Sequence, residues 1–207
     1  MAKFFKNLRK NLVPICLAGT LLAGTSCADF YAENTKIKAG SLAVLVIDMQ
    51  DYWLKDVNKK ELETELPYQA EVLNYCKDNN IPVFVIEYEH CGPTTAYLSN
   101  KLKDMPKKEY VTKTSRSAFE RTNLEEKLKA SGVDTLILMG VYASHCVKGT
   151  AESALGAGFD IVTSKDLIAD KKNSDNHKPE ENVEWYKKHG AYFDSYKQIL
   201  SRINNNG

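Results

Sequence analysis

Residues 134–158 constrain the fold more than any other part of this 207-residue chain. Residues 135–139 form a short apolar run that ends at a glycine, which is typical of a buried parallel strand. From about Cys146 onward, apolar and small residues recur at helical spacing until Gly156 and Gly158, which are helix stop signals. The pattern therefore predicts a strand, a short turn and a helix that begins near Cys146.

The position of Cys146 admits two interpretations. Ligands bind at the carboxyl edge of an open α/β sheet, and the positive end of a helix favours a thiolate over a thiol, so Cys146 is a candidate nucleophile. Cysteine is also among the residues most often buried for packing alone. The position by itself leaves both interpretations open.

Predicted strands and helices alternate along the rest of the chain. Further strands are expected at 42–47, 83–86, 110–112, 160–163 and 191–193. Helices are expected at 65–79, 122–131, 179–188 and 195–203. The second of these would begin with a capping box formed by Thr122 and Glu125. A long polar loop is expected at 88–106. This alternation predicts an α/β fold in which a parallel sheet lies between two layers of helices.

The first 27 residues have the plan of an export signal. Basic residues precede an apolar run at 12–23 that is too short to span a bilayer, and small residues then lead to Cys27. A lipidated Cys27 at the start of a mature lipoprotein is one interpretation, although Gly24 stands where such signals usually have a larger aliphatic residue. Simple secretion and an uncleaved anchor are the others.

These features give an expected domain plan. Residues 1–27 would be the signal, 28–39 a polar tether, 40–203 the folded domain and 204–207 a frayed tail. The protein would then be exported from a bacterial cytoplasm to the cell envelope, with the membrane reached only through a lipid anchor. A net charge of +1 gives no basic footprint for nucleic acid, so the expected partner is a small molecule.

Export would also determine whether the cysteines can form disulfides. Of five cysteines, Cys76, Cys91 and Cys146 remain once Cys16 is removed and Cys27 is lipidated. An oxidising compartment permits a Cys76–Cys91 disulfide, which would leave Cys146 as a free thiol. Three reduced thiols are the alternative.

Three residues with complementary chemistry each follow a predicted strand: Asp48, Lys113 and Cys146. Because the carboxyl ends of parallel strands meet at one edge of a sheet, we expect these side chains to converge there. A cysteine beside a cation and a carboxylate has the groups that covalent acyl transfer requires. Asp48 taken alone could instead be a helix cap.

Three motifs contain these residues: IDMQ at 47–50, KTSRSAF at 113–119 and GVYASHCVKGTAESALGAGFDIV at 140–162. In this order they resemble the isochorismatase-like cysteine hydrolase superfamily, which includes nicotinamidases and carbamoylsarcosine amidohydrolases. The resemblance covers about residues 42–166. It implies a three-layer Rossmann-like sandwich with a mostly parallel sheet of about six strands and a catalytic triad of Asp48, Lys113 and Cys146.

The resemblance further implies a non-proline cis peptide between Val141 and Tyr142, and an oxyanion hole made by the backbone N–H groups of Tyr142 and Cys146. Asp48 would take the thiol proton while Lys113 lowers the pKa of the thiol. Cys146 would then attack the carbonyl of a small amide, ureido or carbamoyl compound and form a thioester, without a cofactor. A vinyl ether hydrolase of the isochorismatase type and a binding lipoprotein that kept the fold are the alternatives.

The walls of the substrate pocket have five candidates: Trp53, Tyr88, Arg116, Phe119 and Tyr142. Core packing would also explain Trp53 and Phe119. Arg116 either pairs with a substrate carboxylate or is merely solvated. For His145 we expect a structural or rim position.

Nicotinamidases hold a metal ion with an aspartate and two histidines after the second strand. This chain has Glu87, Tyr88, Glu89 and His90 there and no DWH-like signature. Glu87, Glu89 and His90 could ligate a metal, but a solvated polar strand end needs none, so we expect no metal. Oligomers are common in the superfamily, and a homo-oligomer is expected by that resemblance alone.

Overall fold

The computed structural model describes residues 37–172 and 179–204. The predicted signal with Cys27, most of the predicted tether, and residues 205–207 of the predicted tail lie outside the described residues. Within the described ranges, none of the helices combines the length and the apolar character that crossing a membrane requires.

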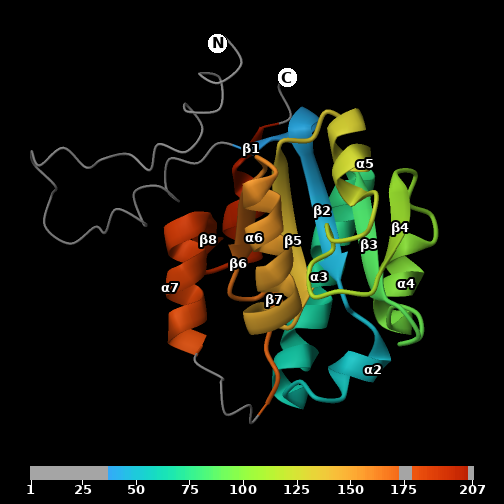
Figure 1. Ribbon diagram of the computed structural model, residues 1–207, viewed down its shortest axis with the longest axis vertical. Helices are drawn as coiled ribbons and strands as arrows, with labels where there is room; N and C mark the ends of the chain where they lie inside the picture. Colours follow the sequence, from blue (N-terminus) through green and yellow to red (C-terminus); the bar gives the residue numbers. More distant parts are fainter. Residues whose placement is uncertain (1–36, 173–178, 205–207) are drawn as a thin grey trace, which may run out of the picture.

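Seven of the described strands form one parallel sheet, in the order β4-β3-β2-β5-β6-β8, and β7 pairs with the end of β5 (Figure 1). They are β2 (Leu42–Ile47), β3 (Val83–Tyr88), β4 (Lys108–Lys113), β5 (Thr135–Val141), β6 (Asp160–Ser164), β7 (Ile168–Ala169) and β8 (Ala191–Phe193). The parallel pairings confirm the predicted sheet, to which the structure adds the short β7.

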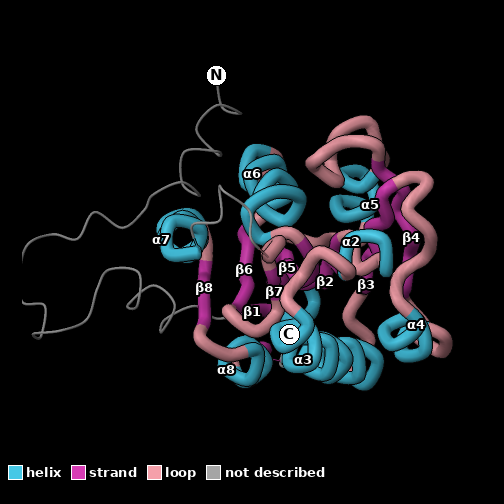
Figure 2. Tube along the Cα trace, turned by 90° about the horizontal axis from the view of Figure 1, so that it is seen from below, coloured by secondary structure: helices cyan, strands magenta, loops and turns pink. Residues whose placement is uncertain are grey.

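Helices cover both faces of this sheet, as Figure 2 shows. One layer holds α5 (Leu124–Ala130), α6 (Lys148–Gly156) and α7 (Pro179–His189). The other holds α3 (Lys59–Asp78), α4 (Ala96–Leu102) and α8 (Tyr196–Ser201). A short helix, α2 (Asp51–Leu54), follows β2 at the carboxyl edge. The predicted three-layer α/β sandwich is confirmed.

Gly140 brings the ends of β2 and β5 unusually close together. It pairs with Ile47 across the two strands and has a φ of +132°, in the region that favours glycine. A Cβ added there would lie 2.0 Å from the carbonyl oxygen of Ile47. Because only a glycine fits, the segments that follow the two strands start side by side at the carboxyl edge of the sheet.

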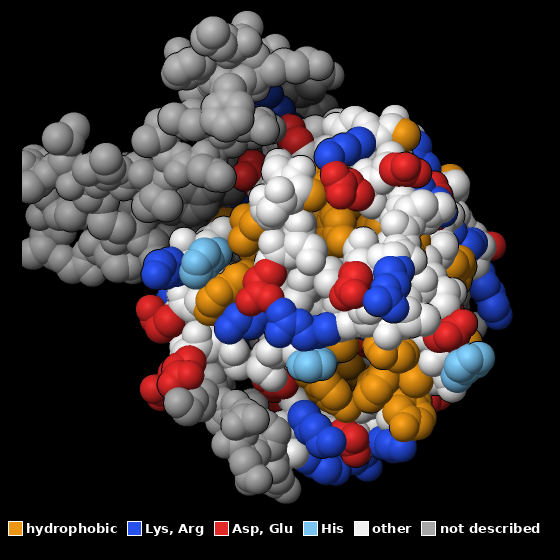
Figure 3. Space-filling view, in the orientation of Figure 1, with side chains coloured by type: hydrophobic (Ala, Val, Ile, Leu, Met, Phe, Trp, Pro, Cys, Tyr) orange, Lys and Arg blue, Asp and Glu red, His pale blue; other side chains and the backbone are white. Residues whose placement is uncertain are grey.

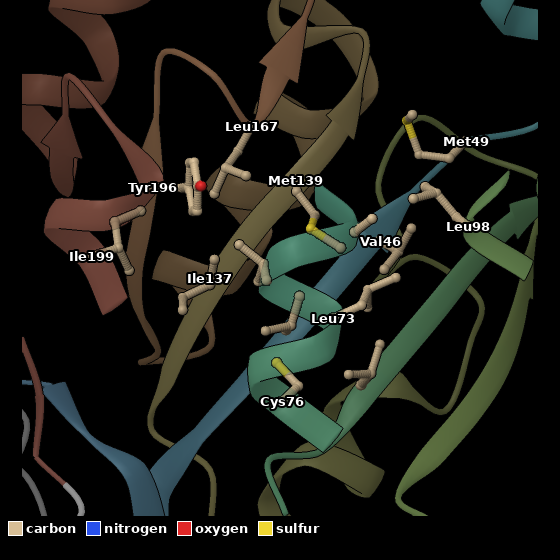
Figure 4. Close-up of a cluster of buried hydrophobic side chains, with 14 of the residues drawn as sticks. Val46, Met49, Leu73, Cys76, Leu98, Ile137, Met139, Leu167, Tyr196 and Ile199 are labelled. Carbon is tan, nitrogen blue, oxygen red and sulfur yellow. The ribbon is translucent and has the colours of Figure 1, made fainter. Parts of the chain in front are cut away.

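The core on the α3 side of the sheet includes one of the cysteines. Leu73 and Cys76 lie on α3 in the same buried cluster as Val46 and Met139 (Figure 4). Burial raises the pKa of Cys76 to about 12. Cys76, Cys91 and Cys146 are all free thiols in the described structure, so the Cys76–Cys91 disulfide does not form.

Two expectations for the segment between β2 and β4 were wrong. α3 begins six residues before the predicted helix, at an Asn58 side chain that accepts a hydrogen bond from the Lys60 N–H (2.9 Å). The predicted loop at 88–106 contains α4, because Leu98 and Leu102 stand one helical turn apart and bury a common face.

The predicted capping box forms only in part. The Thr122 hydroxyl accepts a hydrogen bond from the Leu124 N–H (3.3 Å), but the Glu125 side chain pairs with Lys129 along the helix. The helix α5 begins at Leu124, and Asn123 is its N-cap residue. The Glu125 side chain, which the capping box would need, instead forms an i,i+4 ion pair with Lys129.

The two ends of the described domain are joined by a second, two-stranded sheet. In it β1 (Ile37–Lys38) pairs in parallel with β9 (Ile203–Asn204), and a 3-10 turn (Ala39–Ser41) leads into β2. Ile37 had been assigned to the tether and Asn204 to the tail. Both residues belong to the folded domain instead, since Asn204 pairs with Lys38 in this sheet and the side chain of Ile37 is buried in the core.

Candidate active site

Strands β2 and β4 bring a carboxylate and an ammonium group together at the carboxyl edge of the sheet. Asp48 directly follows β2 with a φ of 54°, in the left-handed region that few residues other than glycine adopt. Lys113 is the last residue of β4 and lies beside Tyr88 of β3. Its Nζ reaches across β3 to within 2.8 Å of the Asp48 Oδ2. Both side chains are almost completely buried.

The Lys113 ammonium group has three kinds of partner. Besides the Asp48 carboxylate, Nζ donates a hydrogen bond to the Ser115 carbonyl oxygen (3.1 Å) and lies 4.5 Å from the centre of the Tyr88 ring. A buried cation is costly unless it is paired and hydrogen-bonded, and these contacts meet that requirement. Lys113 is therefore held in one position behind Asp48.

Cys146 lies in a π-helical turn (Ala143–Val147) between β5 and α6, not at the first residue of an α-helix. The Asp170 carboxylate accepts hydrogen bonds from the Ser144 N–H (3.1 Å) and hydroxyl (2.8 Å). The Tyr186 hydroxyl donates to the Ala143 carbonyl oxygen (2.7 Å). These contacts fix the turn. Asp170 was hard to identify from the sequence, because β7, the strand that precedes it, is only two residues long.

The thiol of Cys146 and the carboxylate of Asp48 line the same cavity, close enough for each to influence the pKa of the other. Burial, followed by the negative charge of Asp48, raises the pKa of Cys146 to about 12, although Lys113 acts in the opposite direction. Burial also raises the pKa of Asp48, against the lowering influence of Lys113. The expected lowering influence of Lys113 is present, but burial and the charge of Asp48 outweigh it. A raised pKa favours the neutral thiol of Cys146 at neutral pH.

The peptide bond between Val141 and Tyr142 is cis, as predicted. It joins the last residue of β5 to the turn that contains Cys146. Tyr142 and Cys146 thus belong to one short segment at the site.

A cavity of about 170 Å³ opens in front of these groups. It is lined by Asp48, Trp53, Tyr88, Arg116, Val141, Tyr142, His145 and Cys146. Figure 3 shows a hollowed apolar area in the lower part of the visible face, bordered by a histidine and by Lys or Arg side chains. His145, expected at the rim, is an exposed member of this lining.

Four of the five predicted wall residues line the cavity, and Phe119 does not. The Phe119 ring packs against Phe159, with 5.8 Å between ring centres, beside the core on the α6 side of the sheet. Phe119 was assigned to the pocket from its place in the KTSRSAF motif. That assignment was wrong because the chain turns this side chain toward the core.

The aromatic walls of the cavity are fixed by hydrogen bonds. The Trp53 ring meets Tyr88 (5.6 Å, 72°) and Tyr142 (6.1 Å, 84°) edge to face. The Tyr142 hydroxyl donates to the Trp53 carbonyl oxygen (2.9 Å), and the Tyr88 hydroxyl donates to that of Thr114 (2.7 Å). The walls are thus built from segments far apart in the sequence.

Gln50 is a further residue of the site that the sequence reasoning did not single out. Its buried amide accepts from the Tyr88 N–H (2.8 Å) and donates to the Tyr88 carbonyl oxygen (3.0 Å) and to that of Gly92. These bonds tie the end of β2 to β3 and so fix the Tyr88 wall. The signal was available, because Gln50 closes the IDMQ motif.

The candidate metal ligands after β3 do not converge. The Glu87 carboxylate accepts hydrogen bonds from the Thr94 N–H (2.7 Å) and hydroxyl (2.8 Å). The side chains of Glu89 and His90 are exposed to solvent. Among the residues that the structure describes, no group of three or more His, Cys, Asp or Glu side chains is placed to hold a metal ion.

A family model and two similar proteins agree on the kind of protein that this chain resembles. A family model described as "Isochorismatase domain" matches residues 42–184. The chain is 29% identical over 169 residues to "Nicotinamidase 3" of Arabidopsis thaliana, covering 72% of this chain and 83% of that protein. It is 33% identical over 178 residues to "N-carbamoylsarcosine amidase" of Arthrobacter sp, covering 72% of this chain and 67% of the relative.

A comparison of structures agrees on the fold. A cysteine hydrolase from Pseudomonas syringae pv. phaseolicola 1448A superposes with a TM-score of 0.71 over 81% of this chain and 94% of the other. The two sequences are 15% identical. At that level the likeness establishes a shared fold.

Proposed function

The chain belongs to the isochorismatase family of hydrolases, and we propose that it is a cysteine hydrolase that cleaves a C–N bond of a small amide, ureido or carbamoyl compound. One observation carries the proposal. The Cys146 thiol and the Asp48 carboxylate line one small cavity, and the buried ammonium group of Lys113 lies 2.8 Å from that carboxylate. A nucleophile, a base and a fixed cation are thus gathered at one site.

In the first step Asp48 accepts the thiol proton as the Cys146 sulfur attacks the carbonyl carbon. The C–S bond forms, and the carbonyl oxygen becomes an oxyanion that the backbone N–H groups of Tyr142 and Cys146 stabilise. Free thiolate is scarce at neutral pH because the pKa of Cys146 is raised to about 12. Proton transfer to Asp48 therefore accompanies the attack and does not precede it.

In the second step Asp48 returns the proton to the nitrogen of the leaving group. The C–N bond breaks, the amine departs and the acyl group stays on Cys146 as a thioester. Water then attacks the thioester carbonyl and gives a proton to Asp48, the C–S bond breaks, and the sulfur takes the proton back. Asp48 acts as base and acid in turn, and its raised pKa brings it closer to the pH at which it can do both.

Vinyl ether hydrolysis, the alternative chemistry, needs the carboxylic acid but no nucleophile. The position of the Cys146 thiol beside Asp48 in the cavity lining favours attack by sulfur, because vinyl ether hydrolysis would leave that thiol without a role. A binding protein without activity would not need a buried Asp48–Lys113 pair, which is expensive to desolvate.

The test is ammonia release by the full chain from a panel of primary amides, ureido acids and carbamoyl compounds. Cys146→Ala and Cys146→Ser should lower the release at least roughly 10³-fold, and Cys91→Ala, which changes a thiol outside the cavity lining, should leave it unchanged. Mass spectrometry of acid-quenched enzyme should find the acyl group on Cys146. Hydrolysis that survives Cys146→Ala would refute the proposal.

A further inference from the structure

Arg116 is a charged member of the cavity lining that the proposed reaction does not use. Among the eight described residues of the lining, Asp48 is the one carboxylate, and Lys113 balances its charge from 2.8 Å. Arg116 brings a second positive charge to the cavity, and its ion-pair partner Glu152 lies outside the lining. A guanidinium group in the lining of a largely aromatic and apolar cavity favours a ligand with a negative charge.

The guanidinium group of Arg116 is held by α6, the helix that follows Cys146. Its stem crosses the helix at Gly149, where an added Cβ would come within 2.5 Å of the Arg116 Nε. Its Nη2 pairs with Glu152 one turn further on. Because Gly149, Glu152 and Cys146 belong to one continuous segment, the guanidinium keeps a fixed position relative to the nucleophile.

Glu152 does not use up the binding capacity of this group. A guanidinium has five N–H donors in a planar fork, and the contacts with Glu152 in the described structure engage Nη2. Glu152 does not line the cavity, whereas Arg116 does. Half-exposed pairs of this kind contribute little to stability, so a bound carboxylate can share the arginine at small cost.

The influence of Arg116 on its neighbour shows that its charge reaches the cavity. Burial lowers the pKa of His145, and the positive charge of Arg116 lowers it further, ahead of Lys113. His145 is itself part of the lining. A carboxylate bound at Arg116 would oppose this influence and raise the pKa of His145.

The cavity also limits the size of the substrate. Its volume of about 170 Å³ is close to that of a cavity of about 150 Å³ that holds one benzene molecule. A compound with roughly six to eight non-hydrogen atoms is of this scale. Such a compound has room for one scissile amide or ureido group at Cys146 and one further polar group.

We propose that Arg116, fixed by Gly149 and Glu152, selects small amides or ureido acids that carry a carboxylate at the end remote from the scissile C–N bond. This inference depends on the proposed function only for which bond is cleaved. The preference for a carboxylate is a property of the cavity and can be measured without turnover.

Isosteric pairs of compounds test the proposal. Succinamate and succinamide differ only in a carboxylate against an amide, as do N-carbamoylglycine and its amide. The wild type should prefer the anionic member of each pair by roughly 10- to 100-fold in kcat/KM. In Arg116→Gln the ratio should fall to about one, and Arg116→Lys should retain part of it because the charge remains without the fork. Arg121→Gln, an exposed arginine outside the lining, is the matched control.

Calorimetric binding of the same pairs to Cys146→Ala separates this inference from the proposed function. Tighter binding of the carboxylate member, lost in the double variant with Arg116→Gln, supports the inference even if no compound of the panel is hydrolysed. Equal binding of both members would overturn it even if Cys146-dependent hydrolysis is found. Failure of both members to bind and to react would overturn it as well.

Discussion

Glu65 is a buried carboxyl group that should weaken the fold at neutral pH. It lies in α3 with 6% of its surface exposed, and its Oε2 has no hydrogen-bond partner among the described residues. Burial, followed by the charges of Glu61 and Asp166, raises the pKa of Glu65 to about 8. The folded chain must therefore keep this group protonated or bury an unpaired charge.

The sign and size of the effect follow from linkage. A raised pKa in the folded state gives a contribution to stability that is complete below the ordinary value of 4.5 and is lost as the pH rises toward about 8. At about 1.4 kcal/mol for each pKa unit, the loss at pH 7 is about 3 kcal/mol. Glu65→Gln stays neutral and avoids it.

Urea unfolding at three pH values measures the effect. Relative to wild type, Glu65→Gln should raise the free energy of unfolding by about 1 kcal/mol at pH 5, about 3 at pH 7 and about 5 at pH 9. Glu63→Gln, at an exposed position of the same helix, should show no such trend. A gain of equal size at all three pH values would refute the reasoning, because it would show that the titration of Glu65 is not its source.

Three further predictions concern the site and its frame. Gly140→Ala puts a Cβ 2.0 Å from the Ile47 carbonyl oxygen. Urea titration should show that the free energy of unfolding falls by roughly 3 kcal/mol or more, and a fall of less than about 1 kcal/mol would contradict this prediction. Cys146 should react slowly with iodoacetamide at pH 7 and steadily faster up to pH 10, since its pKa is raised to about 12, and a plateau below pH 8 in peptide mass spectrometry would count against this. Asp170→Asn should lower kcat roughly 10- to 100-fold with little change in KM, because Asp170 holds the turn at Ser144 and not the substrate; an unchanged kcat would rule out that positioning role.

The central strands were predictable because their local pattern and their environment agree. Every residue of β2 is buried, so an uninterrupted apolar run is both what the sequence contains and what a strand covered on both faces requires. The helix α4 was missed for the opposite reason. Its burial depends on Leu98 and Leu102 alone within a polar segment, and their partners on α3 are distant in the sequence.

The site divides in the same way. Asp48, Lys113 and Cys146 could be expected at one edge because parallel strands end there, a rule of topology that needs no side-chain detail. Phe119 and Asp170 could not be placed, since one depends on how a loop turns and the other on a two-residue strand beside β5. The pKa of the thiol was also beyond the sequence, because burial, its main cause, comes from segments that meet only in the fold.

The buried charges explain why a neutral thiol suits this site at rest. Asp48 and Lys113 are both almost fully buried and balance each other at 2.8 Å. A resting thiolate would set two negative charges against one buried cation, which is the arrangement that desolvation penalises most. A neutral thiol keeps the balance until the carbonyl oxygen of a substrate takes up the developing charge at the backbone. By the same logic a substrate carboxylate is repelled from Asp48, and Arg116 is the cation of the lining that can receive it.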